Sequence, residues 1–130
     1  MTPVQALAID DTRNIAIADQ EIPDRSITSA KATLEKKNSS TLNYWVTATC
    51  GSKADSMTAT IVLQKSENGR WVNKETITRT MTNVTVFNVS GTISITSYGS
   101  GSYRIMVTIS DVHGKITSTY GPFYSNTVVM

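Results

Sequence analysis

Hydrophobic and polar residues alternate along most of residues 27–130, in short runs separated by turn-forming residues. Successive side chains of a β-strand point to opposite faces, so this alternation indicates strands with one buried face. The runs recur about every eight to twelve residues, a spacing typical of β-sandwiches and barrels. Residues 27–130 are therefore expected to form a single all-β domain.

The expected strands follow from these runs. The clearest run is 103–110, which would turn Tyr103, Ile105, Val107 and Ile109 toward the core. The other strands are expected at 27–36, 42–50, 56–65, 71–81, 84–89, 92–96 and from Lys115 onward, with an interruption at Gly121-Pro122. Turns are expected at 51–55, at 66–69 around Asn68-Gly69, and at 111–114, because these segments contain residues that tolerate tight backbone conformations.

Residues 1–26 have a different character from the rest of the chain. Ala6-x-Ala8 has the small-x-small spacing of a signal-peptidase site, so residues 1–8 are expected to be a signal-peptide remnant, with the mature chain starting at Ile9. Residues 9–26 carry five acidic and two basic side chains without periodic apolar spacing. We expect them to form a flexible acidic leader.

Composition and charge exclude several classes of protein. The chain contains 20 Thr and 15 Ser while only 17% of its residues are charged, which is typical of β-rich extracellular domains. The net charge is +2, and basic side chains are spread singly, so we expect no nucleic-acid partner. No apolar run reaches the roughly eighteen residues needed to cross a bilayer, so no membrane span is expected.

The residues that carry reactive chemistry are few. Cys50 is the only cysteine, which excludes an intrachain disulfide, and we expect it to be a small buried hydrophobe. His113 is the only histidine and would lie in a solvated turn, where its neighbour Asp111 would point away from it. The acidic residues lack the spacing of a calcium loop. We therefore assign no catalytic residue, no metal ligand and no cofactor from the sequence.

Two tryptophans are the candidate ligand-binding residues. Trp45 lies on the polar face of its expected strand, where an aromatic ring can stack on a sugar or anchor a partner, or simply cover neighbouring outward side chains. Trp71 follows the Asn68-Gly69 turn, where it would clasp the hairpin or stack on a ligand.

The run Tyr103-x-Ile105-x-Val107-x-Ile109, followed by Asp111-x-x-Gly114, resembles the penultimate strand and last hairpin of immunoglobulin-like domains. The resemblance implies an immunoglobulin-like antiparallel β-sandwich of about seven strands, in which Tyr103 hydrogen-bonds back to the chain. Because Cys50 has no second cysteine to meet, the bacterial branch of this fold is favoured over the antibody branch.

Other segments are similar to an uncharacterised family of small secreted immunoglobulin-like β-sandwich proteins from Gram-positive bacteria. The similarity extends over about residues 27–130 and rests on the segments 27–34, 60–65, Asn68-Gly69-Arg70-Trp71, Gly101-Ser102-Tyr103-Arg104 and Tyr124-Ser125. It implies an exported single-domain protein, and it implies no activity.

These observations favour a non-catalytic interaction or adhesion module, secreted or at the cell surface, whose partner is an unknown protein or glycan. Carbohydrate binding through Trp45 and Trp71 is the first alternative. Self-association through sheet edges is another, with residues 15–22 of one chain adding to the sheet of a second chain. A small secreted hydrolase built on His113 and Asp111 is an alternative of a different class.

Overall fold

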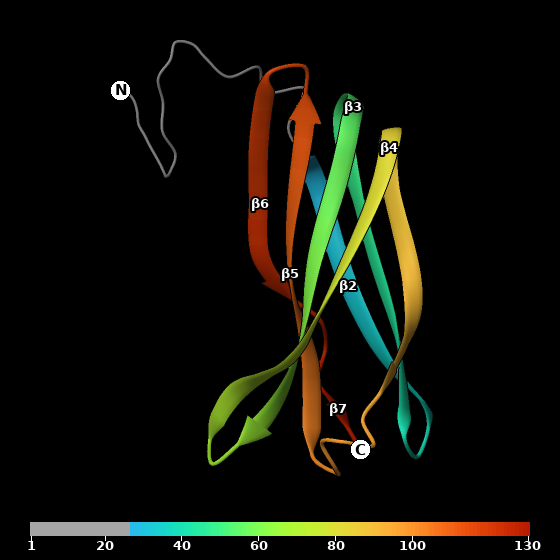
Figure 1. Ribbon diagram of the computed structural model, residues 1–130, viewed down its shortest axis with the longest axis vertical. Coiled ribbons are helices and arrows are strands. Elements are labelled where there is room, and N and C mark those ends of the chain that lie inside the picture. The colour runs from blue at the N-terminus through green and yellow to red at the C-terminus, as the bar shows by residue number, and fades with distance from the viewer. Residues whose placement is uncertain (1–26) are drawn as a thin grey trace.

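Six antiparallel strands follow one another in the computed structural model, which describes residues 27–130. They are β2 (Ile27–Asn38), β3 (Thr41–Glu67), β4 (Arg70–Ser94), β5 (Ser102–His113), β6 (Ile116–Tyr124) and β7 (Val128–Val129). All belong to one hydrogen-bonded sheet that curls strongly into a half-barrel (Figure 1). The predicted all-β antiparallel class is confirmed. The predicted signal-peptide remnant and acidic leader, residues 1–26, lie outside the described residues.

Strand β3 organises the sheet because it pairs with three other strands. Its whole length pairs with β4 in one long hairpin, from Thr41 opposite Ser94 to Glu67 opposite Arg70. Its first part, up to Cys50, pairs with β2, and its second part, from Ser56, pairs with β5. The partner therefore changes halfway along β3.

The change of partner coincides with an irregularity that the sequence analysis interpreted wrongly. A turn was predicted at 51–55, but β3 continues through it, with residues 50–53 lying opposite the single residue Thr85 of β4. Extra residues of this kind form a bulge, which bends a strand without ending it. The separate strands predicted at 71–81, 84–89 and 92–96 are likewise one strand, β4, because its pairing with β3 continues past both expected breaks.

The features predicted at Asn68-Gly69 and at Gly121-Pro122 are confirmed, whereas the turn predicted at 111–114 is wrong, like the one at 51–55. Asn68 and Gly69 have φ values of 54° and 79°, as the tight β3–β4 hairpin requires. A shift in the β5–β6 register lies at Gly121-Pro122, between the pairs formed by Tyr120 and Phe123. The tight turn predicted at 111–114 is not formed, because β5 continues to His113 before the chain turns.

The predicted alternation describes the core well. Inward-facing side chains of β2, β3, β4 and β5 fill the inside of the half-barrel, and most outward-facing side chains between them reach solvent. Val62 and Gln64 of β3 were predicted to face outward into solvent, but they are buried on the outer face. The buried set includes the predicted residues Leu42, Tyr44, Val46, Ala48, Met57, Ala59, Ile61, Leu63, Tyr103, Ile105, Val107 and Ile109. Burial of this apolar surface is the main force that holds the curled sheet together. Among residues 27–130, no helix is long and apolar enough to cross a membrane.

Candidate functional site

The two candidate tryptophans lie toward opposite ends of the long β3–β4 hairpin. Trp45 faces outward near the start of β3, is 37% exposed, and lies between Thr33 of β2 and Ser90 of β4. Trp71 is half-buried at the start of β4, opposite Ser66. The structure therefore does not bring Trp45 and Trp71 into one site.

Trp71 instead belongs to a stack that the sequence analysis did not find. The guanidinium carbon of Arg104, on β5, lies 4.3 Å from the centre of the Trp71 ring and 4.1 Å from the centre of the Tyr124 ring. Tyr124 ends β6 and is 46% exposed. A guanidinium this close to an aromatic face is attracted by the ring quadrupole. We call Trp71, Arg104 and Tyr124 the aromatic–arginine stack.

Hydrogen bonds between side chains fix the stack on the outer face of the sheet. Arg104 Nε donates to Gln64 Oε1 at 2.8 Å, and Gln64 Nε2 donates to Asn73 Oδ1 at 2.9 Å. Gln64 is only 6% exposed, so this anchor is largely shielded from water. Within residues 27–130, the structure shows no acceptor for the two Nη groups of Arg104.

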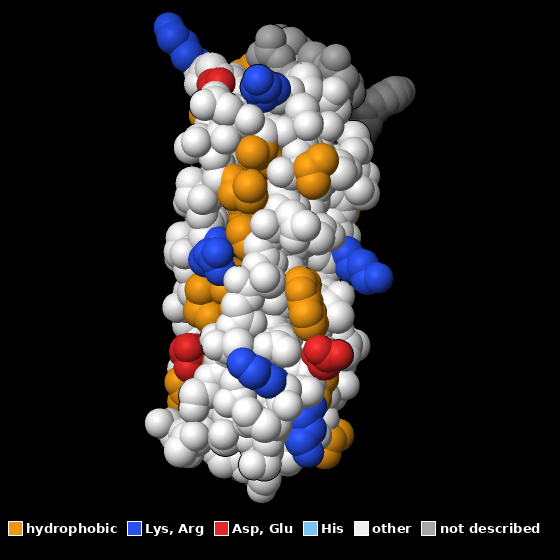
Figure 2. All heavy atoms as spheres, turned by 90° about the vertical axis from the view of Figure 1, so that its right-hand side faces the viewer, with side chains coloured by type: hydrophobic (Ala, Val, Ile, Leu, Met, Phe, Trp, Pro, Cys, Tyr) orange, Lys and Arg blue, Asp and Glu red, His pale blue; other side chains and the backbone are white. Residues whose placement is uncertain are grey.

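Charges on the face that carries β4 are dispersed. Figure 2 shows that Lys and Arg side chains lie at separate points on this face, and that hydrophobic side chains form lines interrupted by polar atoms. A nucleic-acid interface normally presents a continuous basic stripe, and the described residues on this face do not form one.

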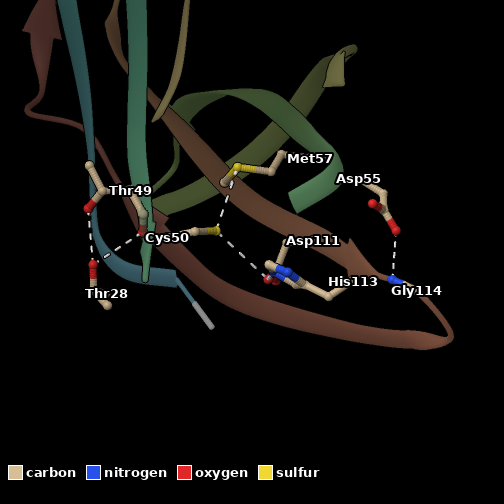
Figure 3. A network of polar contacts seen from close by, with 8 residues as sticks. All are labelled: Thr28, Thr49, Cys50, Asp55, Met57, Asp111, His113 and Gly114. Carbon is tan, nitrogen blue, oxygen red and sulfur yellow. Dashed lines mark hydrogen bonds and ion pairs between the residues drawn. The ribbon is translucent and has the colours of Figure 1, made fainter. Parts of the chain in front are cut away.

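A second group of polar residues lies inside the half-barrel (Figure 3). Cys50 is at the end of the part of β3 that pairs with β2, and Asp111 and His113 end the inward-facing series of β5. Cys50 Sγ is 3.9 Å from Asp111 Oδ2, and His113 Nε2 is 2.9 Å from the same oxygen. Met57 Sδ lies 3.8 Å from the thiol. We call Cys50, Asp111 and His113 the polar cluster.

The expectation of a solvated His113 is wrong. His113 is 6% exposed and Asp111 is 1% exposed, since β5 extends through both residues. Residues two apart on a strand point to the same face, so the extension turns the two side chains toward each other rather than apart. The strand pairs Asp111 with Met57, and Gly114 N donates to Asp55 Oδ2 at 2.6 Å, which holds the end of this hairpin against β3.

The polar cluster lacks the arrangement of a nucleophile and its base. Burial, followed by the charge of Asp111 and its hydrogen bond, raises the pKa of Cys50 to about 11. The thiol therefore keeps its proton at neutral pH, whereas the thiolate is the reactive form. His113 Nε2 faces the Asp111 carboxylate, which itself contacts the thiol, so the imidazole is not placed as the base of Cys50.

No family model, no curated protein and no solved structure matches the chain. The function is therefore argued from the geometry of the aromatic–arginine stack and of the polar cluster.

Proposed function

We propose that the protein is a non-catalytic binding module, secreted or exposed at a cell surface, that recognises glycans carrying carboxylates through the aromatic–arginine stack. The observation that carries this proposal is the guanidinium of Arg104, which lies against both Trp71 and Tyr124 and has no acceptor for its two Nη groups among residues 27–130. The raised pKa of Cys50 argues against a nucleophilic thiol in the polar cluster, which agrees with the non-catalytic assignment.

The chemistry of the stack matches an acidic sugar. Aromatic rings offer apolar surface to the C–H groups of a pyranose, while their polar edges stay hydrated. A guanidinium binds a carboxylate through two parallel hydrogen bonds, which a lysine ammonium cannot reproduce. Because Gln64 already fixes Arg104, little side-chain freedom is lost when the ligand binds.

An immunoglobulin-like arrangement of the strands is part of the same proposal. Its support is Tyr103, whose hydroxyl donates to the carbonyl of Gly99, four residues upstream. In immunoglobulin-like domains a tyrosine at this strand makes such a bond back to the chain. Domains of this type commonly present a binding surface to partners outside the cell, which agrees with the proposed role.

The test measures retention of the full 130-residue chain on insoluble polysaccharides that do or do not contain uronic acids. We expect retention on the uronic-acid polymers, weakened by salt because the contact is partly ionic. Trp71→Ala and Arg104→Gln should each abolish retention without loss of the folded β-sheet spectrum.

Matched controls separate the stack from aromatic surface in general. Trp45→Ala removes the other tryptophan, and Tyr120→Ala removes an exposed tyrosine of the same strand as Tyr124. Both variants should bind as the unaltered chain does. Retention that depends on Trp45, or equal retention on neutral polymers, would contradict the proposal.

A further inference from the structure

The polar cluster places three different metal-ligating atoms together at one end of the core. The Cys50 sulfur, an Asp111 oxygen and a His113 nitrogen all lie within 4.8 Å of one another (Figure 3). They come from two strands that are far apart in the sequence and adjacent in the sheet. We propose that Cys50, Asp111 and His113 bind one zinc-class transition-metal ion.

The separations suit a single ion. In tetrahedral zinc sites the metal–ligand distances are about 2.0–2.3 Å, which puts neighbouring ligand atoms roughly 3.3–3.7 Å apart. The 3.9 Å from sulfur to Asp111 Oδ2 and the 2.9 Å from Oδ2 to His113 Nε2 lie on either side of this range. All three separations stay within 4.8 Å, so side-chain adjustments of up to about 1 Å would bring the three atoms to bonding distance of one centre.

The types of donor atom select the class of metal. Calcium and magnesium prefer sets made only of oxygen, whereas sulfur and imidazole nitrogen favour zinc and its neighbours. Three protein ligands leave a fourth tetrahedral position for water or another small ligand. Met57 Sδ is close to the thiol, but a thioether is a soft ligand that zinc seldom uses, so we place Met57 outside the ligand set.

A cation could replace the two polar contacts that Asp111 Oδ2 makes in the cluster. Asp111 Oδ2 accepts a hydrogen bond from the Cys50 thiol and lies within hydrogen-bond distance of His113 Nε2. A metal ion at this place would take over both contacts, and the thiol proton would leave to solvent as the sulfur–metal bond forms. The exchange involves no change of oxidation state, so it requires no oxidant or reductant.

Cobalt(II) is the probe for this site, because it adopts zinc geometry and absorbs visible light. The reduced, chelator-treated full chain is titrated with Co²⁺, and we expect one equivalent to produce a thiolate-to-cobalt band in the near-ultraviolet and visible bands of tetrahedral intensity. Equimolar Zn²⁺ should remove these bands. Since the chain has one cysteine and one histidine, a thiolate band can come only from Cys50.

Variants test two of the three ligands, Cys50 and His113. Cys50→Ser should remove the near-ultraviolet band, and His113→Gln should weaken Co²⁺ binding by more than about a hundredfold, because losing even an outer-shell partner costs 10- to 100-fold. Met57→Leu is the matched control inside the cluster and should leave the bands unchanged. Absence of a thiolate band at millimolar Co²⁺, or unaltered affinity in His113→Gln, would overturn the proposal.

A measurement on the unaltered chain covers the case in which a variant fails to fold. X-ray absorption at the zinc edge of the zinc-loaded protein should show one sulfur ligand together with nitrogen or oxygen ligands. A shell of nitrogen and oxygen alone would also overturn the assignment of Cys50 as a ligand.

Discussion

Asn126 binds the backbone of Leu34 through both ends of its side-chain amide. Leu34 N donates to Asn126 Oδ1 at 3.0 Å, and Asn126 Nδ2 donates to Leu34 O at 2.9 Å. Leu34 lies in β2, and Asn126 follows β6, 92 residues later. The amide thus makes the pair of hydrogen bonds that a neighbouring strand would make, and it joins the two sides of the curled sheet.

We expect Asn126→Ala to destabilise the protein by about 2 kcal/mol, because it leaves a donor and an acceptor of Leu34 without protein partners. Urea unfolding measures the loss, and hydrogen exchange at the Leu34 amide should accelerate. Asn88→Ala, at an exposed asparagine of β4, is the control and should change stability by less than about 0.5 kcal/mol. Equal effects of the two substitutions would show that Asn126 does not close the sheet.

Tyr103 gives a prediction with a defined pH dependence. Burial raises the pKa of Tyr103 above its usual value, with the charge of Glu67 adding to the effect. The unfolded chain therefore loses the phenolic proton at a pH where the folded chain still holds it. Stability is unaffected below the ordinary tyrosine pKa of about 10 and falls as the pH rises above it.

Substitution separates this effect from other alkaline titrations. Tyr103→Phe should cost about 1 kcal/mol at pH 7 through loss of the hydrogen bond to Gly99 O. Above pH 10 the variant should lose stability less steeply than the unaltered chain. Denaturant unfolding at pH 7 and at several values above 10 provides both measurements, and parallel declines would show that Tyr103 does not titrate differently in the two states.

The aromatic–arginine stack predicts a fluorescence change. In a Trp45→Phe background, Trp71 is the remaining tryptophan. Arg104→Ala should then shift its emission to longer wavelength, because the ring loses its cover, and lower stability by about 1–2 kcal/mol for two cation–π contacts. Arg104→Lys should give a smaller shift. Lys115→Ala is the control, and an unshifted Arg104→Ala spectrum would contradict the stacked geometry.

Local alternation was enough to predict most of the core. The inward positions from Tyr103 to Ile109 are buried as predicted, since a regular strand fixes which side chains share a face. The outward position of Trp45 follows from the same rule and is confirmed. These features depend only on residues next to one another in the sequence.

The two candidate sites depend on pairings that local patterns do not contain. Asp111-Val112-His113-Gly114 has the composition of a turn, but pairing of Met57 with Asp111 extends the strand and buries His113. The aromatic–arginine stack combines side chains of three strands, and nothing near Arg104 in the sequence indicates its two aromatic neighbours. A sheet that curls around a bulged strand brings such residues together through its register.

Gly91 lies where the sequence analysis left a gap between two strands, but the structure requires a glycine there within one long strand. Separate strands were predicted at 84–89 and 92–96, on either side of Gly91, but Gly91 lies within β4, directly opposite Tyr44. A Cβ at position 91 would lie 2.7 Å from Tyr44 Oη and 2.8 Å from Cε2, which is closer than van der Waals contact allows. Tyr44 is 3% exposed and accepts a hydrogen bond from Arg79 Nη1 at 2.8 Å, so the ring has little room to move.

We therefore expect Gly91→Ala to destabilise the protein by about 1–3 kcal/mol through overpacking, although alanine favours a strand more than glycine does. In a Tyr44→Leu background, which removes the crowded ring atoms, the same substitution should be neutral or stabilising. Urea unfolding of the unaltered chain, the two single variants and the double variant gives the coupling energy between Gly91→Ala and Tyr44→Leu. Ser90→Ala, at the adjacent exposed residue, controls for the local change. Additive effects of the two substitutions would mean that Tyr44 does not require glycine at position 91.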